Sequence, residues 1–460
     1  MIRTPAERYD LTVETLIVGA GACGMTAALA AAEAGQEVLV LERDAVPSGS
    51  TALSAGLIPA PATHFQKAAG IRDSAALFAA DIQRKAAGEN DPELVAGLAE
   101  AAGPSIEWLH ETFGLEFSLV HDFDYPGHSR RRMHGLPGRT GQELVDGLRN
   151  AAQSRGIDIV CSAPVTGLHV DAGRRVHGVE ITRPDGTVEA IGCGRLILAC
   201  NGFGGNAGMV RRHLPAIADA LYFGHAGNQG DAMLWGEQIG ARIRYPGAFQ
   251  GHGNVAHPHG ILITWAVITQ GGCQVNIEGH RFWNEALGYS EAACAVLAQP
   301  EGRAFAIFDE RIAGIARQFA DFRDAEGQGA VHRADSPADL AARLHLPADA
   351  LAETMRTFEA GKRGDGPDPF GRRLAGVAQL AAPYCAVQVT GALFHTQGGL
   401  ETNVAGRVRA AEGTFLPNLW AAGGAACGVS GSGDAGYLSG NGLLSAIVMG
   451  RLAGADALTE

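Results

Sequence analysis

Residues 15–24 read TLIVGAGACG, a short apolar run followed by three glycines in the spacing G-x-G-x-x-G. The apolar run predicts a strand, and the alanine-rich stretch that follows, as far as Glu33, predicts a helix. Gly35 is placed to end that helix, and residues 37–41, EVLVL, predict a second strand that leads into Glu42. A strand, a glycine turn, a helix and a strand within about 30 residues form a βαβ unit.

The glycine turn has the local context that a dinucleotide-binding site requires. Gly19 permits the tight turn, Gly21 lets the backbone approach a pyrophosphate, and Gly24 lets the helix pack closely on the strand. The N-terminus of the helix offers N–H groups and a partial positive charge to the phosphates. Glu42 follows at the end of the second strand, where a carboxylate binds ribose hydroxyls. The sequence therefore predicts that this turn binds a dinucleotide.

The composition limits the classes of partner. The chain has 460 residues, 46% of them hydrophobic, and a net charge of -13 without a block of five or more lysine or arginine residues, so we expect neither nucleic acid nor an anionic membrane as a partner. The eight cysteines form no C-x-x-C pair, and we expect no metal site. The N-terminal residues lack the pattern of a signal peptide, and no apolar run is long enough to span a membrane. We expect a cytoplasmic protein.

The order of predicted elements indicates a domain that is interrupted by an insertion. Helical periodicity covers residues 92–113 and 141–155, and alternating strands follow between about 157 and 201. A mixed α+β segment, rich in histidine and aromatic residues, then gives way to strands, glycine loops and a closing helix from Gly442. We expect an α/β fold in which residues 1–225 and 346–460 form one Rossmann-like nucleotide-binding domain and residues 226–345 form an inserted α+β cap domain.

Later segments resemble those of the fumarate reductase and succinate dehydrogenase flavoproteins. The matching segments occur in the family's order and cover nearly the whole chain: residues 49–56 (GSTALSAG), 198–206 (LACNGFGGN), 230–233 (GDAM), 276–285 (NIEGHRFWNE), 395–399 (HTQGG) and 439–444 (SGNGLL). The resemblance implies that the dinucleotide is FAD. The residues that it places against FAD are Gly19, Gly21, Ala22, Cys23, Gly24, Glu42, Arg43, Ser50, Thr51, Ser54, Ala55, Gly56, Val165, Asn201, Gly202, Gly424, Asn441, Leu443 and Leu444.

Two departures from the family pattern affect the cofactor. Succinate dehydrogenases carry a histidine near the first flavin loop that bonds covalently to FAD, whereas this chain has Ser50 and Thr51. We therefore expect FAD to be bound without a covalent link. The family motif A-G-E near the C-terminus reads AGG at residues 422–424, which removes a carboxylate expected near the ribityl chain.

The residues expected in the substrate pocket differ from those of the family in one consistent way, because charged side chains are replaced by uncharged ones. The resemblance places Tyr289 where fumarate reductases have their proton-donating arginine, and Tyr437 where they have an arginine that binds a carboxylate. Phe394 replaces the first histidine of the family's H-H-T motif, and Thr264-Trp265 replaces a Thr-Glu pair. The loss of charged groups predicts a pocket for an apolar or cyclic substrate rather than for succinate.

This replacement resembles the 3-ketosteroid Δ1-dehydrogenases and cyclic-ketone desaturases. Those enzymes use a tyrosine at the position of Tyr289 as base, and a tyrosine with a backbone N–H, here Tyr437 and Gly440, to polarise the ketone. A tyrosine base requires a phenol pKa below the ordinary value of about 10; Tyr125 and His128 are candidates for lowering it. We further expect His395 in catalysis, and His252, Thr264, Trp265, Phe394 and Tyr125 in the substrate pocket.

The sequence leaves alternatives open. The leading hypothesis is desaturation next to the ketone of a small cyclic or steroid-like substrate, with electrons passed to an external acceptor such as oxygen, a quinone or an electron carrier. The second is an oxidoreductase of a carboxylic acid, for which residues 130–132, three arginines, could bind the acid. The third is a flavin-carrying protein without catalytic activity, which a pocket of hydroxyl and imidazole groups disfavours.

Overall fold

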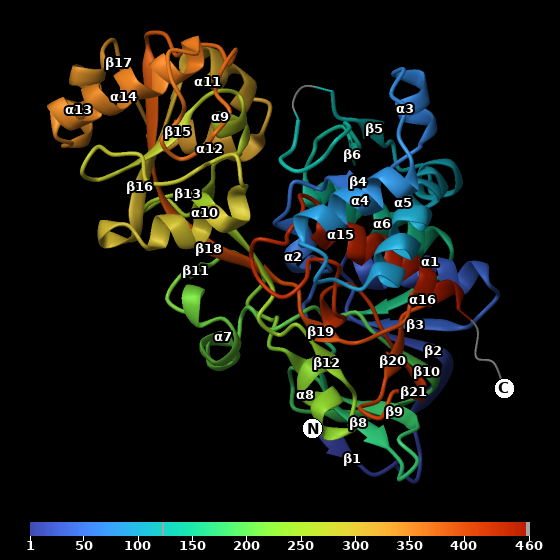
Figure 1. The fold of residues 1–460 in the computed structure, drawn as a ribbon. Helices are drawn as coiled ribbons and strands as arrows, with labels where there is room; N and C mark the ends of the chain where they lie inside the picture. Colours follow the sequence, from blue (N-terminus) through green and yellow to red (C-terminus); the bar gives the residue numbers. More distant parts are fainter. Residues whose placement is uncertain (122–123, 457–460) are drawn as a thin grey trace.

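The computed structural model describes residues 1–121 and 124–456, which form two lobes, each built around a sheet (Figure 1). The nine-stranded sheet of the first lobe has the order β1-β8-β9-β10-β2-β3-β7, and β21 and β20 continue from β10. These strands are β1 (Ile2–Arg3), β2 (Leu11–Val18), β3 (Val38–Leu41), β7 (Asp158–Val160), β8 (Val165–Val170), β9 (Val176–Thr182), β10 (Val188–Leu198), β20 (Arg407–Arg409) and β21 (Phe415–Ala421).

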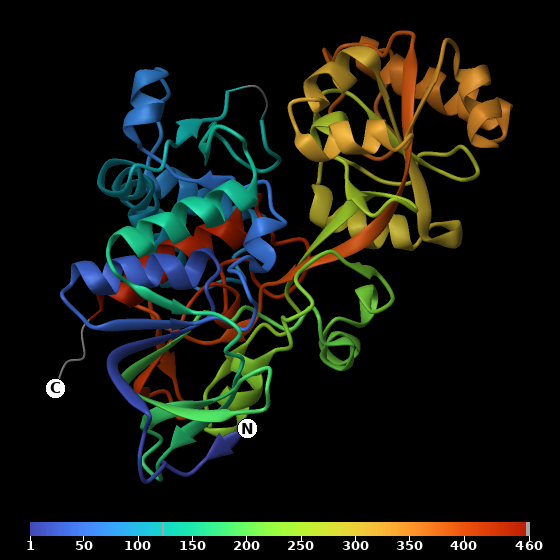
Figure 2. The same ribbon diagram turned by 180° about the vertical axis from the view of Figure 1, so that it is seen from behind.

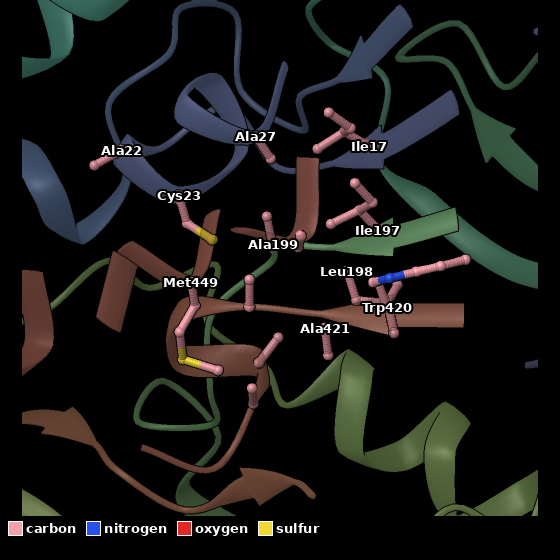
Figure 3. Close-up of a cluster of buried hydrophobic side chains, with 14 of the residues drawn as sticks. Ile17, Ala22, Cys23, Ala27, Ile197, Leu198, Ala199, Trp420, Ala421 and Met449 are labelled. Atoms are coloured by element: carbon pink, nitrogen blue, oxygen red, sulfur yellow. The ribbon is translucent and has the colours of Figure 1, made fainter. Parts of the chain in front are cut away.

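The βαβ unit lies at the centre of this sheet. Strands β2 and β3 are parallel, and α1 (Ala22–Glu33) connects them, which confirms the element order predicted from the sequence. Helix α1 is buried along most of its length, because alanine and glycine let it lie close to the strands. Figure 3 shows Cys23 and Ala27 of α1 beside side chains of β2, β10 and β21, so residues near both ends of the chain share one core.

Further helices and short strands cover the first lobe. The longest is α5 (Pro92–Phe113), where the Asp91 carboxylate accepts backbone N–H groups at the start and Gly114 ends the helix in the left-handed region. This helix and α6 (Gly141–Ser154) occupy the segments predicted from periodicity. The others are α2 (Gly49–Ala52), α3 (His64–Ala68), α4 (Ala75–Lys85), α8 (Asp231–Gln238), α15 (Asn441–Leu444) and α16 (Gly450–Ala455), with β4 (Ile58–Pro59), β5 (Ser118–Leu119), β6 (Met133–Gly135), β12 (Ile243–Arg244) and β19 (Gly399–Leu400).

The second lobe is built on a mainly antiparallel sheet in the order β14-β13-β18-β16-β15, with β11 and β17 also paired to β18. Strand β18 (Tyr384–Thr396) runs from this lobe toward the first, as both views show (Figures 1 and 2). The other elements are β11 (Leu221–Tyr222), β13 (Phe249–Ala256), β14 (Ile261–Leu262), β15 (Cys273–Asn276), β16 (Arg303–Asp309) and β17 (Val331–Ala334), with α7 (Ala207–His213), α9 (Ala266–Thr269), α10 (Tyr289–Leu297), α11 (Glu310–Ala316), α12 (Ala320–Gly327), α13 (Pro337–Leu344) and α14 (Ala348–Arg363).

The boundaries of the second lobe differ from the expected cap of residues 226–345. Helix α8 packs in the first core through Ala232 and Trp235, whereas the second core runs from Ala256 to Val389 and includes α14 and most of β18. The sequence pattern returns to strands near residue 384, but the first of these strands pairs within the second sheet. Expecting the nucleotide-binding domain to resume at residue 346 was therefore wrong.

Across the described ranges, no helix has both the length and the apolar character needed to cross a membrane.

Candidate active site

A cavity of about 560 Å³ extends from the glycine turn of the first lobe to residues of the second lobe. Its walls include Gly21 and Thr51 at one end, and Trp265 and Tyr289 at the other. This volume falls within the roughly 300–1,000 Å³ of small-molecule and cofactor sites, which are common where domains meet.

The glycine turn leaves the backbone open toward the cavity. Gly19 has a φ of +104°, and a Cβ atom at Gly24 would lie 1.8 Å from the Gly19 carbonyl oxygen, so both positions require glycine. Gly21 precedes α1 and gives it no side-chain cap. A Cβ atom at Gly21 would contact only Thr51, so this side of the turn is free for a ligand. The helix N-terminus therefore faces space suited to a phosphate group.

Glu42 lies at the end of β3, where its carboxylate is held by the backbone. One oxygen accepts the N–H of Ala20 at 2.7 Å, and the other accepts the N–H of Asp44 at 3.0 Å. The side chain is 7% exposed and lines the cavity. A carboxylate fixed beside the glycine turn has the position that binding of ribose hydroxyls requires.

The loop around α2 is tied to the nucleotide end. The Thr51 hydroxyl accepts the N–H of Ala22 at 3.1 Å, and the Ser50 hydroxyl accepts the side-chain amide of Asn228 at 2.8 Å. Ser54 donates to the Thr51 carbonyl oxygen at 2.7 Å. These contacts hold a loop of small residues over the cavity and leave its backbone close to any bound ligand.

Most residues that the sequence assigned to FAD line one cavity. They are Gly19, Gly21, Ala22, Cys23, Glu42, Arg43, Ser50, Thr51, Ser54, Ala55, Val165, Asn201, Gly424 and Leu443. The remaining ones do not line it: Gly24, Gly56, Gly202, Asn441 and Leu444 lie behind the wall, where the three glycines allow close backbone packing. A continuous cavity with a phosphate-binding turn, a ribose-binding carboxylate and a distant aromatic end fits an elongated dinucleotide such as FAD.

Gly424, which stands in place of the family glutamate, has a structural reason to lack a side chain. A Cβ atom there would lie 2.1 Å from the Asn201 side-chain oxygen and 2.8 Å from Nε2 of His395. His395 accepts the side-chain amide of Gln397 on Nδ1 at 2.7 Å, so its Nε2 carries the proton. Burial lowers the pKa of His395 to about 4, and the ring is a neutral hydrogen-bond donor at the cavity wall.

The two tyrosines singled out by the sequence meet at the far end of the cavity. The rings of Tyr289 and Tyr437 have centroids 6.1 Å apart and are inclined at 58°. Tyr289 begins α10 of the second lobe, whereas Tyr437 precedes α15 of the first, so the pair spans the junction of the lobes. The Tyr437 hydroxyl oxygen accepts the N–H of Gly442 at 3.2 Å, in the first turn of the helical segment that begins at Asn441.

The environment raises the pKa of both phenols. Burial raises the pKa of Tyr437 to about 12, although the backbone N–H groups of Gly442 and Gly440 oppose the rise. Burial and the neighbouring Tyr437 raise the pKa of Tyr289 well above its ordinary value, and Ser439 only partly opposes this. The expectation of a lowered phenol pKa at Tyr289 is therefore not met by the protein residues. Both groups are protonated at neutral pH.

An aromatic enclosure surrounds Tyr289. The His252 ring stacks on Tyr289 with centroids 4.8 Å apart and on Phe394 at 5.2 Å, and Trp265 meets His252 edge-on at 5.8 Å. Burial lowers the pKa of His252 to about 3, so this ring is neutral. Together with Thr264 and Tyr125, which also line the cavity, these residues form a weakly polar, ring-lined space.

Two expectations about residues 128–132 are wrong. His128 contacts the Ser439 carbonyl oxygen rather than the phenol of Tyr289. Arg132 is buried between Asp73 and Asp81, Arg131 pairs with Asp124, and Arg130 donates to backbone carbonyls. None of the three arginines lines the cavity. The carboxylate partners of Arg132 lie 59 and 51 residues away in the sequence, so the arginine run alone could not reveal that this guanidinium was occupied.

Several residues of the cavity wall were not predicted from the sequence. The most informative are Phe223, His225, Asn228, Gln250 and Arg139. The histidine and glycines just before Gly230 and Asp231 were a signal for a loop near the nucleotide. Arg139 has a φ of +50°, unusual for a residue with a side chain, but no sequence pattern predicts that conformation.

Comparisons with known proteins agree with this geometry. Residues 14–443 match the family described as FAD binding domain. The chain is 30% identical over 450 residues to a probable fumarate reductase of Shewanella frigidimarina, with 97% of this chain and 75% of the relative covered. It is 25% identical over 574 residues to 4-oxocyclohexanecarboxylate 2-dehydrogenase of Sinomonas cyclohexanicum, with 99% of this chain and 95% of the relative covered.

A solved structure supports the same assignment. The 3-ketosteroid-Δ4-(5α)-dehydrogenase of Rhodococcus jostii, in complex with 4-androstene-3,17-dione, has a TM-score of 0.79 and 25% identity, and 100% of each chain is covered. The chain belongs to the FAD binding domain family, within the fumarate reductase and succinate dehydrogenase flavoprotein superfamily, and is an FAD-dependent oxidoreductase that acts on CH–CH groups.

Proposed function

We propose that this protein binds FAD without a covalent link and introduces a C=C bond α,β to the ketone of a small cyclic substrate. The observation that carries the proposal is the Tyr289–Tyr437 pair, with ring centroids 6.1 Å apart at the ring-lined end of the cavity. Tyr289 and Tyr437 stand at the two positions where the family resemblance implies arginines. A space of aromatic and neutral imidazole rings suits an apolar ring better than a dicarboxylate.

The first task of the site is to polarise the ketone. The Tyr437 hydroxyl is held by the Gly442 N–H, and Gly440 also lines the cavity next to it. In our proposal the Tyr437 O–H and the Gly440 N–H donate to the ketone oxygen and stabilise the negative charge that develops there. Donors that are already oriented in a site of low dielectric contribute most to such stabilisation.

The second task is to move a proton at the carbon beside the ketone. We assign this to Tyr289, which faces Tyr437 across the cavity. When bound, FAD supplies the two-electron acceptor for the hydride that leaves the adjacent carbon. A protonated phenol is ready to give a proton in the reductive direction, and the same residue must lose its proton before it serves as base in desaturation.

A second candidate is an oxidoreductase of a carboxylic acid. Arg139 favours it, because this residue lines the cavity and, although burial raises the pKa of the Tyr125 phenol more strongly, its positive charge acts to lower that pKa. Arg43, the other arginine that the structure describes in the cavity wall, lies at the nucleotide end beside Asp231. A single arginine near the ring-lined end would serve one carboxylate, as in a cyclic ketone that bears an acid group, better than the two of a dicarboxylate.

The test is anaerobic reduction of the bound flavin, followed at its visible absorbance. The panel contains cyclohexanone, 4-oxocyclohexanecarboxylate, a 3-ketosteroid and succinate. We expect one or more of the cyclic ketones to bleach the flavin and succinate to leave it oxidised. Bleaching by succinate alone would replace the proposal with the acid oxidoreductase. Acid precipitation should release yellow FAD into the supernatant, and colour retained in the pellet would contradict the non-covalent attachment.

A further inference from the structure

A buried charged network lies behind the loop that carries Tyr437 and Gly440. Arg132 is fully buried and pairs with Asp73 at 2.8 Å and with Asp81 at 2.6 Å. These contacts hold the pKa of both carboxyl groups below the ordinary range, to about 2 for Asp81. The network is therefore charged at neutral pH. Its position is fixed by direct hydrogen bonds between ionised groups, which are stronger than those between neutral groups.

His128 connects this network to the loop that carries Tyr437 and Gly440. Its Nδ1 lies 3.1 Å from Nη1 of Arg132, and its Nε2 lies 2.9 Å from the carbonyl oxygen of Ser439. An arginine can only donate hydrogen bonds, so Nδ1 must be the acceptor. The proton of the neutral ring is consequently on Nε2, which donates to the Ser439 carbonyl. Burial and the adjacent Arg132 lower the pKa of His128 to about 4, which keeps the ring in this neutral form.

The ring of His128 is also held on its face. It stacks on Phe78 with centroids 6.0 Å apart at 23°, and the guanidinium of Arg132 lies 4.8 Å from the centroid of the same Phe78 ring. Phe78 is fully buried. The imidazole is therefore fixed by contacts at both nitrogen atoms and along its plane, as expected of a group that positions another.

The Ser439 carbonyl belongs to the same peptide group as the Gly440 N–H. A hydrogen bond accepted by a peptide carbonyl polarises the whole amide and makes its N–H a stronger donor. Gly440 has a φ of +86°, and a Cβ atom there would lie 2.6 Å from Cδ of Pro59, so no other residue could take up this backbone conformation without strain. The backbone thus turns at the point where the peptide meets the cavity wall.

We propose that His128 is a positioning residue: it orients and polarises the Ser439–Gly440 peptide, so that the Gly440 N–H is a stronger donor to the substrate oxygen. This inference rests on the proposed function, because it assumes that a ketone oxygen is bound at Gly440. The chain of groups runs from Asp73 and Asp81 through Arg132 and His128 to the peptide. The residues of this chain that precede the peptide do not line the cavity.

The variants separate the hydrogen bond from the packing. His128→Phe keeps an aromatic ring against Phe78 but removes the donor to Ser439. His128→Gln can restore both a donor to Ser439 and an acceptor for Arg132. The control is His134→Phe, which removes another buried imidazole of the same segment; its Nε2 lies 2.9 Å from the Thr63 hydroxyl and it does not line the cavity.

The probe is a fluorinated phenol, whose ionised oxygen resembles that of an enolate. The ¹⁹F NMR shift of the bound phenol reports its ionised fraction. We expect the FAD-loaded wild type to prefer the phenolate over the neutral phenol. One full donor to an oxyanion is worth roughly 10²–10³, and His128→Phe weakens the Gly440 donor without removing it, so this variant should lose about tenfold of the preference. His128→Gln should recover most of it. Ketone turnover should follow the same order through kcat with little change in KM, and His134→Phe should keep the wild-type preference.

The outcomes distinguish the two proposals. If wild type prefers the phenolate and His128→Phe keeps that preference in full, the role of His128 is refuted while the ketone function stands. If wild type shows no preference for the phenolate, the ketone function itself fails, and the role assigned to Gly440 fails with it. Should His128→Phe not fold, ¹⁵N NMR of wild-type His128 decides: protonated Nε2 and bare Nδ1 support the proposal, and the opposite tautomer overturns it.

Discussion

Lys85, at the end of α4 in the first lobe, forms an ion pair with Glu291 in the first turn of α10 in the second lobe. Lys85 also donates to the Leu287 carbonyl oxygen at 2.9 Å. Both contacts flank Tyr289, which begins α10. The pair is mostly buried, with side-chain exposures of 14% and 16%. It therefore connects the lobe that binds the nucleotide to the helix that presents the proposed base.

Replacement of Lys85 by methionine should release α10 from the first lobe. Among the described residues, one oxygen of the Glu291 carboxylate has no hydrogen-bond partner. In the variant this carboxylate would be left buried without the Lys85 counter-charge, and a lower melting temperature is expected. Misplacement of a reacting group by about 1 Å can cost on the order of 10²-fold in rate, so we expect kcat to fall by at least about tenfold. FAD content should be unchanged.

The control for this variant is Arg356→Met, which breaks the exposed Arg356–Glu353 pair in α14 of the second lobe. It should leave both melting temperature and kcat close to wild type, because exposed pairs contribute little. Wild-type kcat in Lys85→Met would show that the ion pair does not position Tyr289.

The rate of desaturation should rise with pH. The pKa of Tyr289 is raised well above its ordinary value, so the ionised fraction at neutral pH is small and grows about tenfold per pH unit below that pKa. Transfer of a proton in the reductive direction needs the protonated phenol and should not show this rise. The pKa values of His252 and His395, about 3 and about 4, place the titration of these two rings below the pH range from 6 to 9.

Single-turnover rates of flavin reduction by a ketone, measured from pH 6 to 9.5, test this dependence. A rate that is flat over this range in wild type would mean that ionisation of Tyr289 does not limit desaturation. A rise that persists unchanged in Tyr289→Phe would assign it to another group.

Tyr437→Phe should slow the reaction without loss of the cofactor. The variant keeps the ring but removes the hydroxyl that accepts the Gly442 N–H and that we assign to the ketone oxygen. The loss of one oxyanion donor costs roughly 10²–10³-fold in rate. Tyr384→Phe, in β18 and outside the cavity wall, is the control. Equal flavin reduction rates for Tyr437→Phe and wild type would remove Tyr437 from the mechanism.

Gly424→Ala should weaken FAD binding. The new Cβ atom would lie 2.1 Å from the Asn201 side-chain oxygen and 2.8 Å from Nε2 of His395, and both side chains line the cavity. Overpacking of this kind should raise the Kd for FAD by about tenfold or more. Flavin fluorescence on titration into the apoprotein measures it, with Gly433→Ala as control, because a Cβ atom there meets no neighbour. An unchanged Kd would contradict the assigned packing.

The local patterns of the sequence predicted the first lobe well. The βαβ unit, α5 and α6 follow from periodicity and glycine placement, which act over a few residues. The end of the second lobe did not follow, because the pairing of β18 with β16 is a contact between distant segments. A strand-like pattern gives the existence of a strand but not the sheet that it joins.

In the candidate site, too, local motifs were predictive and properties that depend on distant segments were not. The family motifs identified Tyr289 and Tyr437, which the fold brings together. The raised pKa of each phenol, in contrast, depends on burial by segments far apart in the chain. The role of His128 was also hidden, since its partner Ser439 lies 311 residues away.

The most direct test of the account is stopped-flow reduction of the flavin by an active cyclic ketone in Tyr289→Phe and in wild type. The variant keeps the ring that stacks on His252 at 4.8 Å but cannot exchange a proton. Loss of general base assistance typically costs about 10²–10⁴-fold, so we expect slower reduction by that factor, with FAD content and ketone binding preserved. Reduction at the wild-type rate would contradict the central claim that Tyr289 moves the proton beside the ketone.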